Sequence, residues 1–267
     1  MGYYNVGSIE VQVDFSQSSV MITAMLNQVV LNLCNLVYPP HCLICNKPFV
    51  NRFPREWLCL HCQQLIQRNH PPCCLKCSRH LREMPHAPVC ASCQNKKIAF
   101  DFAWAACLYE EPLNQLIYQF KYRQKSYLHH YFSKLLIHCI HTNQFDIHQF
   151  DYIIPIPLFS TRLRERGYNQ AQLLAQDLAT YFNIPLCCNQ LFKARPTQVQ
   201  AQLNEKERWT NLRGAFRIKH PEIFNQKRVL IIDDLLTTGA TCSEAAYLFK
   251  KANAKIAAVM TLAITPS

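Results

Sequence analysis

One stretch of the chain decides the fold: Arg228-Val-Leu-Ile-Ile-Asp-Asp-Leu-Leu-Thr-Thr-Gly-Ala-Thr-Cys-Ser-Glu-Ala-Ala246. Val229 to Ile232 form an unbroken apolar run, which is typical of a strand buried on both faces of a parallel sheet. Asp233 and Asp234 follow where we expect this strand to end, and open α/β sheets bind ligands outside such strand ends. A helical pattern begins at Ala240. The stretch therefore predicts an α/β domain with a binding site after this strand.

The loop between this strand and this helix has the composition of a phosphate site. It offers threonine hydroxyls and backbone N–H groups, and a helix start adds unpaired donors and a positive dipole end. The two carboxylates would repel phosphate, so we expect them to meet hydroxyls or a cation. A sugar phosphate satisfies both ends. An ordinary strand, turn and helix with an aspartate cap would explain one carboxylate, but not two with a threonine cluster. The loop residues are Thr237, Thr238, Gly239, Ala240 and Thr241.

This run resembles the phosphoribosyl-pyrophosphate (PRPP) signature of type I phosphoribosyltransferases, with four apolar residues, two acidic residues and a loop rich in threonine and glycine. The resemblance implies a mainly parallel sheet flanked by helices. It also implies that Asp233 and Asp234 hold the ribose hydroxyls and that the loop wraps the 5′-phosphate.

Composition excludes a disordered chain, because only 17% of the 267 residues are charged and 49% are hydrophobic. The most apolar long run, 20–38, contains four Asn and Gln residues, so we expect an amphipathic helix rather than a membrane span. Residues 1–38 are interpreted as an extension with this helix. Signal-peptide features are lacking, which predicts a cytoplasmic protein. The net charge of +11 favours anionic partners, although a solvated basic face would give the same count.

The fifteen cysteines are concentrated in the first third of the chain and predict metal sites. Two consecutive sets of paired CxxC motifs match the four-thiolate shell of structural zinc. Disulfides would require an oxidising compartment, and the spacing does not suggest an iron–sulfur cluster. Neighbouring histidines and Cys73 could replace a ligand, so one or two zinc ions remain open. The proposed ligands are Cys42, Cys45, Cys59, Cys62, Cys74, Cys77, Cys90 and Cys93.

The cysteines thin out near residue 100, so we predict a double zinc-ribbon domain over 39–99 and an α/β domain over 100–267. We expect a strand over 103–109 and helices over 112–122 and 127–141. Between these helices lies Phe-Lys-Tyr-Arg-Gln-Lys, in which cations alternate with aromatic residues. Lys121, Arg123 and Lys125 are candidate DNA-binding residues, but a helix end with dipole-complementing cations looks the same.

Two further segments are predicted to complete the site. A second buried strand over 151–157 leads into an arginine-rich loop over 161–170, in which Arg162 and Arg166 suit a pyrophosphate because guanidinium groups pair with two oxygens at once. The segment 193–216 is long and polar and is interpreted as a mobile flap. We assign a catalytic role to its Arg195 together with Asp233 and Asp234.

Residues 34–264 resemble the ComF family, phosphoribosyltransferase-like proteins linked to natural competence. The matching motifs are the tandem CxxC segment, Pro155-Ile-Pro157 with Arg166-Gly-Tyr-Asn-Gln170, Arg195-x-Thr-Gln-x-x-x-Leu203 with Arg208-x-x-Asn-x-x-Gly-Ala-Phe216, and Ile231-Ile-Asp-Asp-Leu-Leu-Thr-Thr-Gly-Ala-Thr241.

The resemblance to the ComF family implies a Mg²⁺-dependent PRPP site and a cytoplasmic role in DNA uptake and transformation, with incoming single-stranded DNA and competence-machinery proteins as partners. It supplies no acceptor, and no side chain stands out as a general base. Two alternatives stay open: nucleobase salvage, and a non-catalytic PRPP or nucleotide sensor that binds DNA. P-loop and GxGxxG motifs are absent from the sequence.

Overall fold

The computed structural model describes residues 41–48, 57–81, 88–197 and 205–266. The chain forms two compact units, Met1–Cys59 and Leu60–Ser267. The amphipathic helix expected over 20–38 lies outside the described residues. Residues 60–99 belong to the same compact unit as the sheet. The domain border that we expect at residue 100 therefore stays a prediction.

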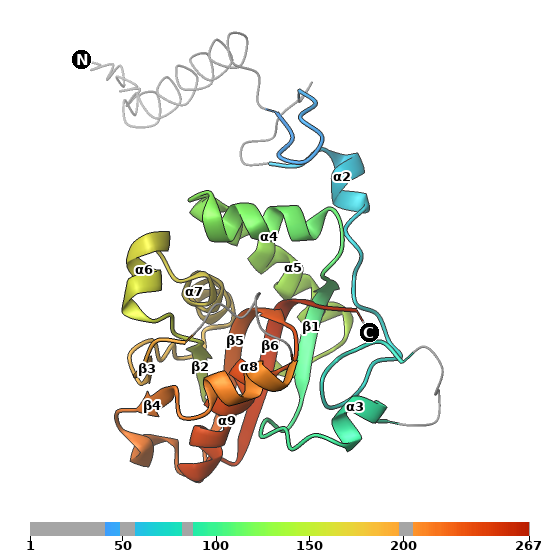
Figure 1. The fold of residues 1–267 in the computed structure, drawn as a ribbon. Helices are drawn as coiled ribbons and strands as arrows, with labels where there is room; N and C mark the ends of the chain where they lie inside the picture. Colours follow the sequence, from blue (N-terminus) through green and yellow to red (C-terminus); the bar gives the residue numbers. More distant parts are fainter. Residues whose placement is uncertain (1–40, 49–56, 82–87, 198–204, 267) are drawn as a thin grey trace, which may run out of the picture. The chain divides into compact units, whose positions relative to one another are not determined.

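A four-stranded parallel sheet forms the centre of the larger unit (Figure 1). Its strands are β1 (Ala103–Leu108), β2 (Tyr152–Pro155), β5 (Arg228–Leu236) and β6 (Ile256–Ile264), in the order β1-β6-β5-β2. This sheet confirms the predicted α/β class. Strand β6 was not predicted from the sequence, although it is an inner strand and is buried almost throughout.

Helices cover both faces of the sheet because alternate residues of each strand point to opposite sides. Val229 and Ile231 of β5 belong to one core cluster with Ala245 and Phe249 of α9 (Ala240–Lys251). Neighbouring β5 residues point the other way. Two further helices, α5 (His129–Thr142) and α7 (Gln170–Phe182), also pack against sheet strands.

Several elements differ from the sequence predictions. Strand β5 continues to Leu236, so Asp233 and Asp234 lie inside the strand rather than after it. The arginine-rich loop is a helix, α6 (Ser160–Arg166), which ends at Gly167 with φ 77°. This helix has no buried face, and the sequence therefore gave no apolar periodicity to recognise. The expected helix 127–141 begins instead with a 3₁₀ turn, η1 (Ser126–Leu128).

The predicted flap contains regular structure in its described part. Strands β3 (Leu191–Lys193) and β4 (Phe216–Ile218) pair antiparallel at its base, and α8 (Glu205–Leu212) lies between them in sequence. The remaining elements are α2 (Leu60–Gln64), α3 (Ala91–Gln94), α4 (Leu113–Tyr122), η2 (Ile147–Gln149) and η4 (Pro221–Phe224).

The residues that lead into and contain the second set of four cysteines, here called the second cysteine segment, pack against the edge strand β1. The backbone N–H of Asn69 donates to the Ala106 carbonyl at 3.0 Å, and its side-chain amide donates to the Ala105 carbonyl at 3.2 Å. The Ser78 hydroxyl accepts from the N–H of Ala105 at 3.0 Å. These contacts cover backbone groups of β1, which otherwise stand at the edge of the sheet.

Across the parts of the chain that the structure describes, no helix has both the length and the apolar character needed to cross a membrane.

Candidate functional site

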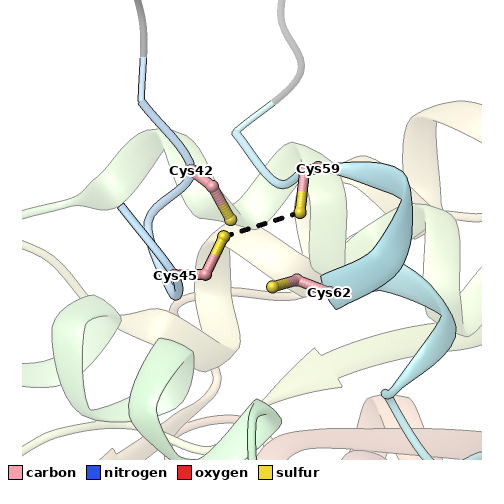
Figure 2. Close-up of side chains that lie close together, drawn as sticks. All are labelled: Cys42, Cys45, Cys59 and Cys62. Atoms are coloured by element: carbon pink, nitrogen blue, oxygen red, sulfur yellow. Dashed lines mark hydrogen bonds between the residues drawn. The ribbon is translucent and has the colours of Figure 1, made fainter. Parts of the chain in front are cut away.

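Four thiol groups converge in the first cysteine cluster, which consists of Cys42, Cys45, Cys59 and Cys62 (Figure 2). Their sulfur atoms all lie within 4.8 Å of one another, and the Cys45 and Cys59 sulfurs are 3.7 Å apart. A tetrahedral zinc ion with Zn–S bonds of about 2.3 Å separates its sulfur ligands by roughly 3.8 Å. The arrangement therefore fits a closed structural zinc site.

The second cluster repeats this design with Cys74, Cys77, Cys90 and Cys93. The Cys77 and Cys90 sulfurs are 3.7 Å apart. Hydrogen bonds from the Cys77 thiol and from the backbone N–H of Cys90 lower the pKa of Cys74 to about 4, which favours the thiolate that a metal requires. Cys73 is not a member, because its thiol donates to the His70 carbonyl. Among the described residues, neither cluster includes a histidine.

A cavity of about 510 Å³ lies beside the carboxyl end of β5. Its lining includes both carboxylates, Asp233 and Asp234, and the loop residues Thr237 and Thr241. Its volume falls in the range typical of small-molecule sites. Arg162 and Arg166 belong to the same lining, so residues predicted from separate stretches of sequence lie around one cavity.

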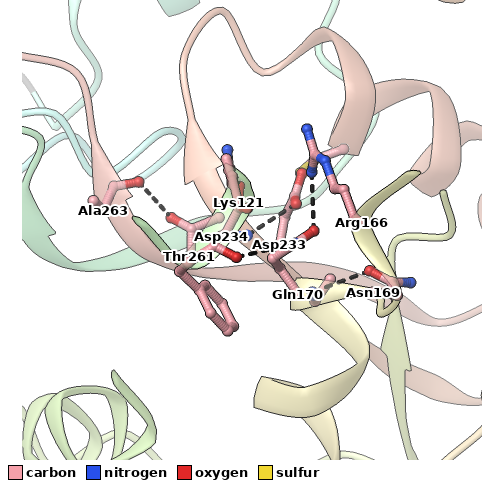
Figure 3. Close-up of polar contacts among 11 residues, drawn as sticks. Lys121, Arg166, Asn169, Gln170, Asp233, Asp234, Thr261 and Ala263 are labelled. Atoms are coloured by element: carbon pink, nitrogen blue, oxygen red, sulfur yellow. Dashed lines mark hydrogen bonds and ion pairs between the residues drawn. The ribbon is translucent and has the colours of Figure 1, made fainter. Parts of the chain in front are cut away.

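An ion pair joins α4 to the acidic residues of β5. Lys121 Nζ lies 2.8 Å from Asp234 Oδ1, and the backbone N–H of Asp234 donates to Asp233 Oδ1 at 2.9 Å (Figure 3). The Tyr168 hydroxyl donates to the carbonyl of Phe120, the residue before Lys121. Lys121, which we predicted as a DNA-binding residue, thus lines the cavity and pairs with Asp234, and its DNA-binding role stays a prediction.

Burial and charge repulsion perturb Asp233. Desolvation, reinforced by the Asp234 charge, raises the pKa of Asp233 to about 7. Burial opposes the charge on Lys121, but the ion pair with Asp234 outweighs burial and raises the Lys121 pKa. Desolvation and the nearby Arg162 lower the pKa of Lys193, another cavity residue, to about 8. The cavity lining therefore combines cationic side chains, which favour an anionic ligand, with two carboxylates, which favour hydroxyls or a cation.

Replacing Asp233 by asparagine is expected to stabilise the fold at alkaline pH. The pKa of Asp233 rises from an ordinary 3.8 to about 7, so the folded chain holds its proton more tightly than the unfolded chain. The stability that this contributes is complete below pH 4 and is lost as the pH rises through about 7. We therefore expect the variant to unfold at higher urea concentration than the wild type at pH 8, with a smaller difference at pH 5. Lower stability of the variant at pH 8 would contradict the shift.

Contacts from Arg79, Ala99 and Phe100 support the loop and first turn at the N-terminus of α9. Gly239 has φ 79°, and a Cβ there would lie 3.5 Å from the Phe100 ring. The guanidinium of Arg79, two residues after Cys77, donates to the Thr237 carbonyl. The Ser243 hydroxyl accepts from the N–H of Ala99 at 2.9 Å. The second cysteine segment therefore supports the loop that we assigned to the 5′-phosphate.

Two of the three arginines that we predicted for the site line the cavity, and the third does not. Arg162 and Arg166 of α6 line the cavity, and Arg166 donates to Gln170 Oε1 at 2.9 Å. Arg195 does not line it; its guanidinium donates to the carbonyls of Asn211 and Arg213 at 2.9 and 2.7 Å. The guanidinium of Arg195 thus connects two parts of the predicted flap, and its catalytic role stays a prediction.

Three cationic residues of the cavity were not predicted as ligand contacts from the sequence: Lys121, Lys193 and Arg208. Lys193 Nζ donates to the Thr197 hydroxyl at 2.7 Å. The polar flap pattern was the available signal for Lys193 and Arg208. The remaining loop residues, Thr238 and Gly239, face a small gap shared with Arg79, and Ala240 is buried.

Comparison with known families gives the class of the protein. A double zinc ribbon domain matches residues 33–94, and a phosphoribosyl transferase domain matches residues 169–267. The chain is thus a zinc-ribbon protein that carries a phosphoribosyltransferase domain.

Its relatives narrow this class. Competence protein F of Haemophilus influenzae is 30% identical over 209 residues, which cover 72% of this chain and 90% of that protein. DNA utilization protein YhgH of Escherichia coli K12 is 30% identical over 225 residues, 78% of this chain and 97% of that protein. Competence protein ComFC of Bacillus subtilis is 26% identical over 244 residues, 83% of this chain and 93% of that protein. The chain belongs to the ComF family.

Proposed function

We propose that the cavity binds PRPP together with Mg²⁺, and that the chain is a phosphoribosyltransferase-like protein of the ComF type. One observation carries this proposal. The carboxylates of β5, Thr237 of the loop before α9 and Thr241 of the first turn of α9 line the same cavity, so hydroxyl acceptors and phosphate donors could meet one ligand there.

The cavity offers a complementary group for each part of PRPP. In this proposal the 5′-phosphate lies on Thr237–Thr241, where the helix dipole and the backbone N–H groups of the helix start favour an anion. The ribose hydroxyls donate to Asp233 and Asp234. The pyrophosphate lies near Arg162 and Arg166, whose guanidinium groups can each bind two of its oxygens.

Electrostatics support the same orientation. Lys121 neutralises one of the two carboxylates, and a phosphate beside Lys193 would favour the charged form of this lysine, whose pKa is lowered to about 8. The oxygen atoms of Asp233 and Asp234 are hard ligands of the type that Mg²⁺ prefers. Mg²⁺ bound with PRPP would neutralise charge on the departing pyrophosphate. The arginines would add to that stabilisation from fixed positions.

We place this activity in the handling of incoming single-stranded DNA during natural competence, in the cytoplasm and with competence-machinery proteins as partners. The names of the relatives refer to competence and to DNA utilization. The net charge of +11 is suited to an anionic polymer.

Isothermal calorimetry of the wild-type chain tests the proposal. We expect PRPP with Mg²⁺ to bind more tightly than ribose 5-phosphate or pyrophosphate alone, because PRPP engages both subsites at once. Magnesium should be omitted, not chelated, in the reference titration because a chelator would also remove zinc. Failure of PRPP to bind, or binding no tighter than that of either half, would contradict the proposal.

Turnover is a separate question with a separate measurement. Mass spectrometry of reactions containing PRPP and nucleobases, nucleotides or single-stranded DNA would detect a ribosylated product and identify its acceptor. Product from one free base would indicate salvage. PRPP binding without any product would indicate a sensor.

A further inference from the structure

Two exposed tyrosines stand at the cavity on α4. Tyr118 and Tyr122 are each 51% exposed, although aromatic rings usually bury most of their surface. They are four residues apart, so both lie on one side of the helix, and their ring centroids are 5.0 Å apart. Both residues line the cavity that contains the carboxylates. An aromatic pair exposed at a pocket indicates a surface that a ligand covers.

Cationic side chains lie close to these rings. The Arg166 guanidinium of α6 lies 5.1 Å from the centre of the Tyr122 ring. Helix α4 contains Lys121 and no acidic residue, while α6 contains three arginines and Glu165. Arg123, directly after α4, is exposed, and Tyr127 is exposed a short distance further along the chain. The surface thus combines π faces with positive charge.

We propose that Tyr118 and Tyr122 form a stacking platform for bases of single-stranded DNA at the cavity. This inference rests on the proposed function, because it identifies the partner of the same site. Bases can stack on side chains only when they are not paired within a duplex, and each base offers a face of similar size. Arg123 and Arg164, which are exposed and do not line the cavity, would contact the phosphates of the same strand. Recognition of this kind tolerates any sequence.

The plain alternative is that these tyrosines are ordinary surface residues. The chain supplies a matched control for this alternative in Tyr181 of α7 and Tyr247 of α9, which are 59% and 53% exposed. Neither of them lines the cavity. Replacing either pair removes two exposed rings and no charge, so a difference between the two double variants reports position alone.

Fluorescence anisotropy of a labelled oligothymidine with the full-length, zinc-loaded chain tests the platform. We expect Tyr118→Ala with Tyr122→Ala to weaken binding by about tenfold or more, since a stacked base contributes on the order of 1–3 kcal/mol. The slope of affinity against salt should remain, because phosphate contacts set that slope. Tyr118→Phe with Tyr122→Phe should restore affinity, because stacking requires the ring and not the hydroxyl.

Binding by the alanine pair equal to that of the wild type would overturn the platform, as would an equal loss in the Tyr181 and Tyr247 control. Failure of the phenylalanine pair to bind would also overturn it. Absence of wild-type DNA binding would reject the partner as well. The proposed function would still be judged independently by PRPP calorimetry, so the two failures are distinguishable. Zinc content and thermal melting of each variant confirm that its fold is intact.

Discussion

Replacing Asp233 and Asp234 together by asparagine is expected to abolish PRPP binding while zinc content and folding stay intact. Hydrogen bonds to charged acceptors contribute about 1.5–3 kcal/mol each, so the loss of two corresponds to at least a hundredfold in affinity at roughly 1.4 kcal/mol per tenfold. Asparagine keeps the size of each side chain but removes the charge that a ribose hydroxyl or Mg²⁺ would meet. Calorimetry with PRPP and Mg²⁺ measures the effect.

A matched control is Asp146→Asn with Glu222→Gln. These two carboxylates are exposed and do not line the cavity, and their replacement changes the net charge by the same amount. We expect the control to bind PRPP like the wild type. If the Asp233 and Asp234 variant also retained wild-type affinity, the assignment of the carboxylates to the ligand would be wrong.

Loss of the second metal cluster is expected to remove one zinc ion and to weaken PRPP binding together. Cys77→Ser breaks a four-thiolate shell, and structural zinc sites contribute on the order of 10 kcal/mol to folding of their segment. Arg79 lies two residues after Cys77 and donates to the Thr237 carbonyl at the loop assigned to the 5′-phosphate. Among the residues that the structure describes, its buried Nε has no hydrogen-bond partner. The loop should therefore lose support.

Cys73→Ser is the matched control for this prediction. It replaces an adjacent thiol that bonds to His70 instead of joining the cluster. We expect it to retain the zinc content and PRPP affinity of the wild type. Zinc measured by atomic absorption and affinity measured by calorimetry should fall together in Cys77→Ser only. Zinc loss with unchanged PRPP affinity would show that the loop does not depend on the ribbon.

Local patterns predicted the parts of the site that are continuous in sequence. The apolar run of β5, the start of α9 at Ala240 and both sets of four cysteines were recognisable because strand, helix and metal-ligand spacings are short-range properties. The hydrogen bonds of Cys73 and Cys74 then distinguished two neighbouring thiols that spacing alone left equivalent.

Long-range contacts explain what the sequence did not predict. The Lys121–Asp234 ion pair joins residues 113 positions apart, and no local pattern connects them. Helix α6 lacks a buried face, so its sequence has no apolar periodicity and predicted a loop. Arginine is a residue type that commonly binds anionic ligands, but the guanidinium of Arg195 donates to the carbonyls of Asn211 and Arg213, which lie further along the predicted flap. Packing between distant elements decided each of these outcomes.

A crystal structure of the chain with PRPP and Mg²⁺ tests the central claim most directly. The account predicts the 5′-phosphate against the N–H groups of Thr237–Thr241, the ribose hydroxyls within hydrogen-bond distance of Asp233 and Asp234, and the pyrophosphate beside Arg162 and Arg166. Density for PRPP outside this cavity, or in the reversed orientation with pyrophosphate at the α9 N-terminus, would contradict it.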